Sequence, residues 1–96
     1  MKPSKVLQQY RDVIRRIIER GRLHNPRVFG SVVHGDDKDG SDLDLLVDAG
    51  PGVTLFHMGG LQAELEEALG VRVDLVTPED LSPRIRERVL REAKPV

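Results

Sequence analysis

The sequence contains no cysteine, very few aromatic residues and almost no net charge. Without cysteine, the chain can form neither disulfides nor thiolate metal sites, and this composition fits a reducing compartment. Aromatic residues make up only 3% of the chain, so it lacks the stacking platforms on which single-stranded nucleic acid binds. The formal net charge of -1 also argues against direct nucleic-acid binding.

Long hydrophobic segments are absent as well. No apolar run approaches the roughly 18 residues that a membrane span requires, and the N-terminal residues lack the apolar segment of a signal peptide. We therefore expect a cytoplasmic protein with no membrane partner. A length of 96 residues predicts one domain, residues 1–96, with room for one core and one site.

Apolar periodicity predicts helices and strands along the chain. The fold we expect from them is α/β (α+β), with a small mixed β-sheet of three or more strands and helices packed on one face. Helical spacing is found at residues 4–20, from 55 to about 69, and after Pro83. Alternating or short apolar runs predict strands at residues 27–29, 43–47 and 71–76.

Local signals set the expected boundaries of these elements. Ser4 and Thr54 are expected to cap two of the helices. Asn25-Pro26 predicts a turn before the first strand. The Gly59-Gly60 pair is unfavourable inside a helix, by roughly 1 kcal/mol per glycine, and therefore predicts close packing or a bend there.

Three aspartates follow the strand pattern in a way that predicts a site. Asp42 and Asp44 alternate with leucines, so both project from one face of a strand, about 7 Å apart. Asp74 occupies the equivalent face of the next strand. If the apolar faces of both strands pack on the helices, all three carboxylates converge on the open side of the sheet. Such a cluster favours a magnesium ion, which takes oxygen ligands from one or two carboxylates and from substrate phosphates.

Together these residues resemble the nucleotidyltransferase (DNA polymerase beta-like) superfamily, and specifically its small minimal nucleotidyltransferase (MNT) branch. The matching residues are Gly30-Ser31, Gly35, Ser41-Asp42-Leu43-Asp44-Leu45 and the later Asp74. The resemblance implies a nucleotidyltransferase fold and an enzyme that uses ATP and Mg2+. It also implies that Asp42, Asp44 and Asp74 are catalytic residues that bind the metal.

The resemblance further implies that Gly30, Ser31, Gly35 and Ser41 bind the nucleotide. Gly30 would let the backbone approach a triphosphate without a side chain in the way. Ser31, at the start of a helical turn, could donate its hydroxyl and backbone N–H to phosphate oxygens. No Gly-x-x-x-x-Gly-Lys-Ser/Thr segment exists, so the site is not of the Walker type.

The chain departs from the family at His34, where the family often has arginine in Gly-Ser-x-Ala-Arg-Gly. Histidine is largely neutral near pH 7 at an unperturbed pKa, so a fixed positive charge is weakened. The neighbouring Asp36, Asp37 and Asp39 are interpreted as a solvated loop, and the arginines near the C-terminus as a solvated helix face.

In this branch the usual partner resembles a helical HEPN ribonuclease toxin. The first hypothesis is therefore an antitoxin enzyme that transfers AMP from ATP to a hydroxyl of the toxin, with tyrosine as the expected acceptor. The second is a non-catalytic antitoxin that masks the toxin by binding. The third is a small-molecule nucleotidyltransferase, which would need a pocket completed by a homo-oligomer or another subunit.

Overall fold

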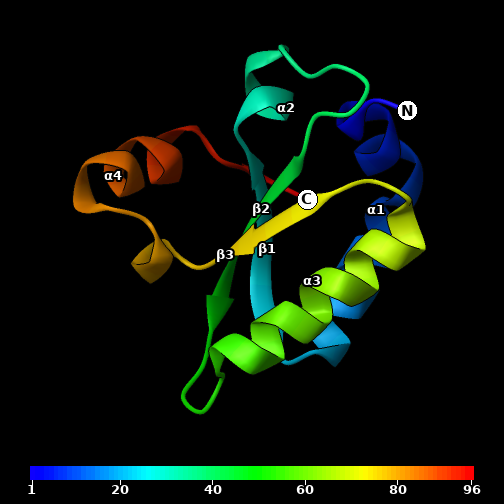
Figure 1. The fold of residues 1–96 in the computed structure, drawn as a ribbon. Helices are drawn as coiled ribbons and strands as arrows, with labels where there is room; N and C mark the ends of the chain where they lie inside the picture. Colours follow the sequence, from blue (N-terminus) through cyan, green and yellow to red (C-terminus); the bar gives the residue numbers. More distant parts are fainter.

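The computed structural model describes residues 1–96, which form one mixed sheet with helices around it (Figure 1). The sheet contains β1 (Leu23–Phe29), β2 (Leu43–Ala49), β3 (Val73–Val76) and β4 (Lys94–Pro95). The strands lie in the order β3-β2-β1-β4. Strand β2 is parallel to β3, whereas β1 is antiparallel to both β2 and β4. The expected mixed sheet is confirmed, and β4, which the sequence did not predict, extends it by a fourth strand.

The helices lie on both sides of this sheet. They are α1 (Pro3–Arg20), α2 (Ser31–His34), α3 (Leu55–Leu69), the 3-10 helix η1 (Pro78–Asp80) and α4 (Pro83–Glu92). Helices α1 and α3 lie together against one face, and α4 lies on the opposite side of the strands (Figure 1). None of the helices combines the length and the apolar character that crossing a membrane requires.

The main core lies between the sheet and the pair α1 and α3. Leu43, Leu45 and Val47 of β2 are completely buried and belong to the same apolar cluster as Ile14 of α1 and Leu65 of α3. Because side chains alternate along a strand, these three residues direct the intervening positions of β2 to the other face. The core therefore fixes which way the aspartates of β2 point.

The apolar stripe of α3 starts one turn later than the sequence pattern indicates. Met58 and Leu61 are buried, but Leu55 and Phe56 in the first turn are 81% and 93% exposed.

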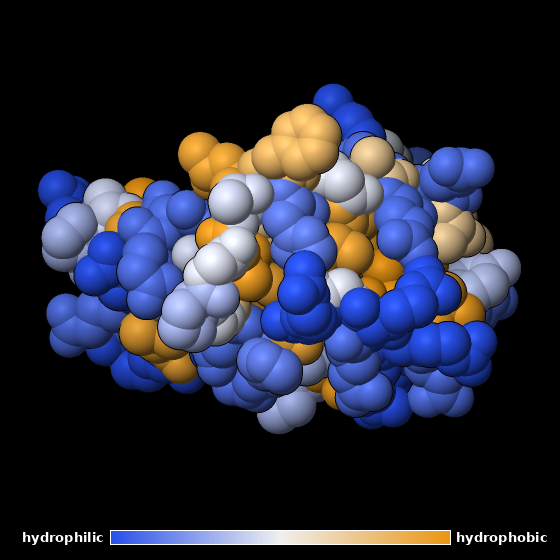
Figure 2. All heavy atoms as spheres, turned by 90° about the horizontal axis from the view of Figure 1, so that it is seen from below, coloured by the Kyte–Doolittle hydropathy of each residue, from blue (hydrophilic) through white to orange (hydrophobic).

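The surface seen from below is mainly hydrophilic, with apolar atoms gathered in small patches (Figure 2). The glycine pair of α3 also differs from expectation, because side chains built at Gly59 and Gly60 would meet no atom within 4 Å.

Two of the predicted boundaries near the N-terminus are wrong. Ser4 does not cap α1, because Pro3 already occupies the first helical position, where its fixed φ and missing N–H are favourable. Asn25-Pro26 is not a turn before β1 but lies inside it, at an irregularity in the pairing with β2. Asn25 has a φ of 51°, so this segment changes the register without ending the strand.

Candidate active site

Two neighbouring parallel strands bring Asp44 and Asp74 side by side. In the register of β2 with β3, Asp44 lies opposite Asp74, and Leu45 lies opposite Leu75. Both leucines are buried in the core, so both carboxylates project from the other face of the sheet. Asp44 is half-buried and Asp74 is exposed. The convergence inferred from alternation is therefore present for this pair.

Asp42 lies just before β2 and has a different environment. Its Oδ1 is 3.1 Å from Nε of Arg72, and both side chains are largely exposed. Arg72 precedes β3 and also donates a hydrogen bond to the carbonyl oxygen of Gly40, at 3.4 Å. Asp42 thus has a cationic partner, whereas its neighbour Asp44 has none.

Uncompensated negative charge is the main electrostatic feature of the site. Burial, together with the charges of Asp74 and Asp42, raises the pKa of Asp44 from 3.8 to about 6. Burial and the charges of Asp42 and Asp80 also raise the pKa of Asp74. No neighbouring group lowers the pKa of either carboxyl. A cation between the two aspartates would relieve this repulsion.

Gly30 connects the end of β1 to the start of α2 and faces Asp44 directly. Phe29 lies opposite Asp44 across β1 and β2, and Gly30 follows it with a φ of 75°. A Cβ at Gly30 would clash with Oδ2 of Asp44. Glycine is thus required here both by the backbone conformation and by the aspartate carboxylate, a reason that the sequence alone did not reveal. Ser31 then opens α2 beside the site.

Gly35 and Ser41 lie at the two ends of the loop that connects α2 to β2. Gly35 ends α2 with a φ of 74°, and a side chain there would meet no atom within 4 Å. Ser41 Oγ accepts the backbone N–H of Lys38 at 2.9 Å, and the Ser41 N–H donates to the Lys38 carbonyl oxygen at 3.0 Å. In this structure both residues shape the loop.

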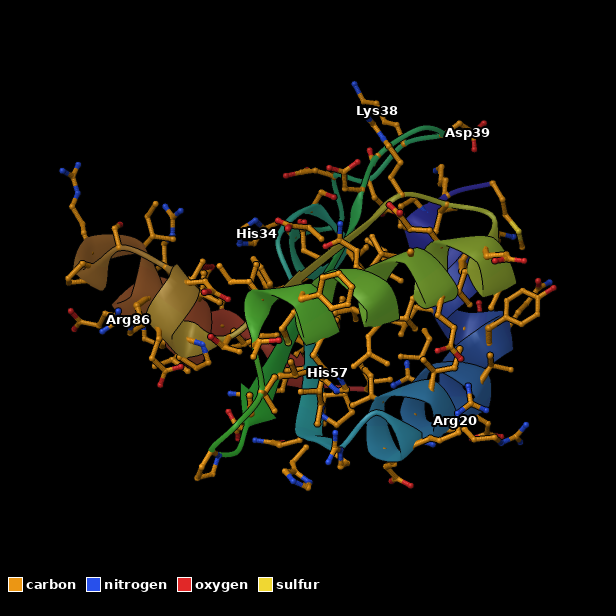
Figure 3. All side chains as sticks on the ribbon, turned by 60° about the horizontal axis from the view of Figure 1, so that its bottom comes forward. Arg20, His34, Lys38, Asp39, His57 and Arg86 are labelled. Atoms are coloured by element: carbon orange, nitrogen blue, oxygen red, sulfur yellow. The ribbon has the colours of Figure 1, made fainter.

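His34, the last residue of α2, connects this short helix to α4. Its Nε2 lies 2.7 Å from Oε2 of Glu92, and the side chain extends from α2 towards α4 (Figure 3). The hydrogen bond from His34 is the main reason that the pKa of Glu92 is lowered. The partner of this histidine is therefore a helix carboxylate. On the same helix, Arg86 is not a solvated residue, since it donates to the carbonyl oxygens of Pro78 and Leu81.

The donor set fits magnesium in part. No three His, Cys, Asp or Glu side chains lie close enough together to hold a metal ion by themselves. Magnesium commonly needs only one or two protein carboxylates, with water and substrate phosphates completing its six ligands. Asp44 and Asp74 supply two uncompensated carboxylates at adjacent strand positions. The residues present thus fit a magnesium ion that arrives with a phosphate ligand.

Asp80 is a neighbour of the site that the sequence reasoning missed. It contributes to the raised pKa of Asp74 and also accepts hydrogen bonds from the backbone and hydroxyl of Thr77, at 2.9 and 3.1 Å. The signal that could have found it is the Thr77-x-x-Asp80 capping box at the end of β3.

Known proteins resemble this chain in sequence and in overall fold. A family model described as the nucleotidyltransferase domain matches residues 7–96. The chain belongs to the nucleotidyltransferase family. Protein adenylyltransferase MntA from Thermococcus cleftensis is 43% identical to this nucleotidyltransferase over 74 residues, which cover 77% of this chain and 75% of that protein.

Solved structures support the same family. One of an inferred minimal nucleotidyltransferase matches with a TM-score of 0.85 and 44% identity, over 97% of this chain and 95% of that one. A toxin–antitoxin structure with AMP-PNP matches with a TM-score of 0.77 and 26% identity, over 88% of this chain and 69% of that one. The expected nucleotidyltransferase fold is confirmed, and the chain is an enzyme of this family.

Proposed function

We propose that this nucleotidyltransferase transfers AMP from ATP to a hydroxyl of a HEPN-type toxin, with tyrosine as the expected acceptor, and thereby acts as an antitoxin. The observation that carries the proposal is the uncompensated Asp44 and Asp74 pair beside the Gly30-Ser31 turn. Similarity to a named protein adenylyltransferase and to a toxin–antitoxin structure with AMP-PNP supports the choice of reaction and partner.

The residues of the site have distinct roles in this proposal. Gly30 leaves the backbone free of a side chain where phosphate oxygens would approach. Ser31 offers its hydroxyl and backbone N–H to those oxygens. Asp42, Asp44 and Asp74 form the acidic side of the site, with the Asp44 and Asp74 pair as the principal metal ligands. A bound magnesium ion would supply positive charge that offsets the triphosphate and polarises the reacting phosphoryl group.

The transfer itself is a displacement at the α-phosphorus of ATP. The acceptor hydroxyl oxygen forms the new bond to phosphorus, and the bond to the β-phosphate oxygen breaks, so pyrophosphate leaves with that electron pair. Asp74 is proposed to accept the hydroxyl proton, because its carboxylate is exposed and can be reached by an incoming side chain. We take residues 1–96 as one minimal nucleotidyltransferase domain, so that the toxin itself presents the acceptor.

Intact-mass analysis tests the proposal. A HEPN toxin is incubated with the chain, ATP and magnesium, and the mass of the toxin is expected to rise by whole AMP units. Asp44→Asn should abolish the increment. Asp39→Asn, which neutralises an exposed loop aspartate, should leave it intact and serves as the matched control.

The same assay separates the alternatives. Tight binding and inhibition of the toxin without a mass increment would replace the proposal with a masking antitoxin. That alternative gains support from His34, which stands where the family often has an arginine that could contact phosphate. The His34 side chain contacts Glu92 instead. If the chain neither binds the toxin nor increases its mass, the toxin assignment is refuted and a small-molecule acceptor is favoured.

A further inference from the structure

Asp37 is the one buried charged residue of the chain, and the proposed chemistry does not use it. It is 8% exposed, although the sequence indicates a solvated loop for Asp36, Asp37 and Asp39, an interpretation that is wrong for Asp37. Its neighbours in the loop, Asp36 and Lys38, are both exposed. A buried carboxylate is costly unless it is hydrogen-bonded, so its partner identifies what the residue does.

The partner of Asp37 is the N-terminus of α1. Oδ2 of Asp37 accepts the backbone N–H of Ser4 at 2.8 Å, in the first turn of an 18-residue helix. The N-cap residue Lys2 provides no side-chain cap of its own. Burial opposes ionisation of Asp37, but hydrogen bonds from Ser4 and the charge of Lys2 outweigh it and lower its pKa. A loop residue thus caps a helix that lies 33 positions away in sequence.

The loop that Asp37 fixes joins both halves of the candidate active site. At its start, the N–H of Asp36 donates to the carbonyl oxygen of Ser31 at 2.9 Å. At its end, the loop leads through Ser41 into β2, the strand of Asp44. Between these points lies its tip, with the exposed side chains of Lys38 and Asp39 (Figure 3), and Asp39 Oδ1 is 3.4 Å from the N-terminal ammonium group that precedes α1. Asp37 is therefore the buried attachment of this loop to α1, beside two exposed contacts: that of Asp39 with the N-terminal ammonium group, and that of the Gly40 carbonyl oxygen with Arg72 at 3.4 Å.

We propose that Asp37 is a positioning residue for nucleotidyl transfer. By attaching the loop to α1, it fixes the Gly30-Ser31 turn relative to Asp44 without touching the reacting groups. Because misplacement of reacting groups by about 1 Å can lower a rate about 100-fold, loss of this attachment should lower kcat. The inference rests on the proposed function for its kinetic readout.

Kinetics of three variants test the inference. Asp37→Ala removes the acceptor, Asp37→Asn retains an acceptor oxygen, and Asp36→Ala is a matched control at an exposed neighbour. All are measured well below their melting temperatures, so that a purely structural role would leave the kinetics of the folded protein unchanged. We expect kcat for adenylyl transfer to fall about 10- to 100-fold in Asp37→Ala, to recover largely in Asp37→Asn, and to stay unchanged in Asp36→Ala. A folded Asp37→Ala protein with kcat within twofold of the unaltered protein would overturn the inference.

A variant on the helix side keeps the test decisive if Asp37→Ala does not fold. Lys2→Glu replaces a favourable charge near Asp37 with a like charge and leaves the loop unaltered. We expect a loss of kcat of a few-fold at low salt that is restored at high salt, because salt screens exposed charges. An unchanged kcat at low salt would count against the inference.

Failure of the proposed function is recognised separately. If the unaltered protein transfers no AMP, that function is refuted, and backbone amide NMR spectra still decide the role of Asp37. The inference then predicts that a variant at Asp37, unlike Asp36→Ala, shifts the amide signals of Ser31 and Asp44. Unshifted signals at both residues would overturn it.

Discussion

Replacing Asp44 with asparagine should make the protein more stable at neutral pH while removing its activity. Asp44 has no partner that favours its charged form, because burial and two neighbouring aspartates all raise its pKa. Asparagine has nearly the same shape but no charge. The substitution therefore removes an unfavourable interaction and leaves the packing of β2 in place.

The magnitude follows from the pKa. The change from 3.8 to about 6 is roughly two units, and each unit corresponds to about 1.4 kcal/mol. That gives about 3 kcal/mol as an upper limit for the gain. Because Asp44 is only half-buried, solvent screening lowers the expected gain in the free energy of unfolding to about 1–2 kcal/mol. For a domain of this size, such a gain raises the melting temperature by about 4–16 °C.

The gain should depend on pH in a defined direction. Since the folded-state pKa of Asp44 lies above that of the unfolded chain, the folded protein binds more protons between about pH 4 and pH 6. The free energy of unfolding of the unaltered protein therefore falls as the pH rises through this window. Asp44→Asn should match the unaltered protein near pH 4 and exceed it most above pH 7.

Thermal unfolding followed by circular dichroism, without divalent cations, from pH 4 to pH 8 measures this difference. Asp36→Asn is the matched control, because Asp36 is exposed and is not among the charges that raise the pKa of Asp44, so its neutralisation should bring no comparable gain. An Asp44→Asn protein that is no more stable than the unaltered one at pH 8, or a gain independent of pH, would refute the reasoning.

Two further predictions concern glycines. Gly30→Ala should abolish transfer and destabilise the fold by more than the about 1–3 kcal/mol expected for its backbone conformation alone (φ 75°, ψ -142°), because its Cβ would also clash with Oδ2 of Asp44. Gly40→Ala, at a φ of 87° in open space, lacks the clash and should lose less free energy of unfolding when the two variants are compared in denaturant. Gly59→Ala and Gly60→Ala should each raise the free energy of unfolding by up to about 1 kcal/mol, because both glycines lie in α3 with room for a methyl group. A lower melting temperature of either variant would contradict this prediction.

Strand alternation carried most of what could be predicted about the site. The buried partners Leu43 and Leu45 fix the direction of Asp44, and one short parallel strand with the same pattern brings Asp74 beside it. The alternation within each strand is local information and places each aspartate on one face of its strand. That the two strands are neighbours was an added assumption, which the register of β2 with β3 confirms. Thr54 at the start of α3 was predicted equally well, and its hydroxyl accepts the N–H of His57 at 3.1 Å.

The errors arose where a contact between distant segments overrides a local signal. Asn25-Pro26 usually marks a turn, but pairing with β2 on one side and β4 on the other keeps it within β1. Asp37 has the composition of a solvated loop, yet it is buried because the N-terminus of α1 needs a carboxylate. Neither partner can be identified from residues near in sequence.

The distribution of charge around the strand ends separates the three aspartates in function. Arg72 compensates Asp42, whereas Asp44 and Asp74 remain without a cation and repel each other. A chain selected only for stability would place a neutral residue at Asp44, as the predicted gain from asparagine indicates. The unfavourable charge of Asp44 is explained if a cation binds between Asp44 and Asp74 during function and offsets their repulsion. Magnesium should therefore reverse the order of stability, raising the melting temperature of the unaltered protein with ATP present and leaving that of Asp44→Asn nearly unchanged.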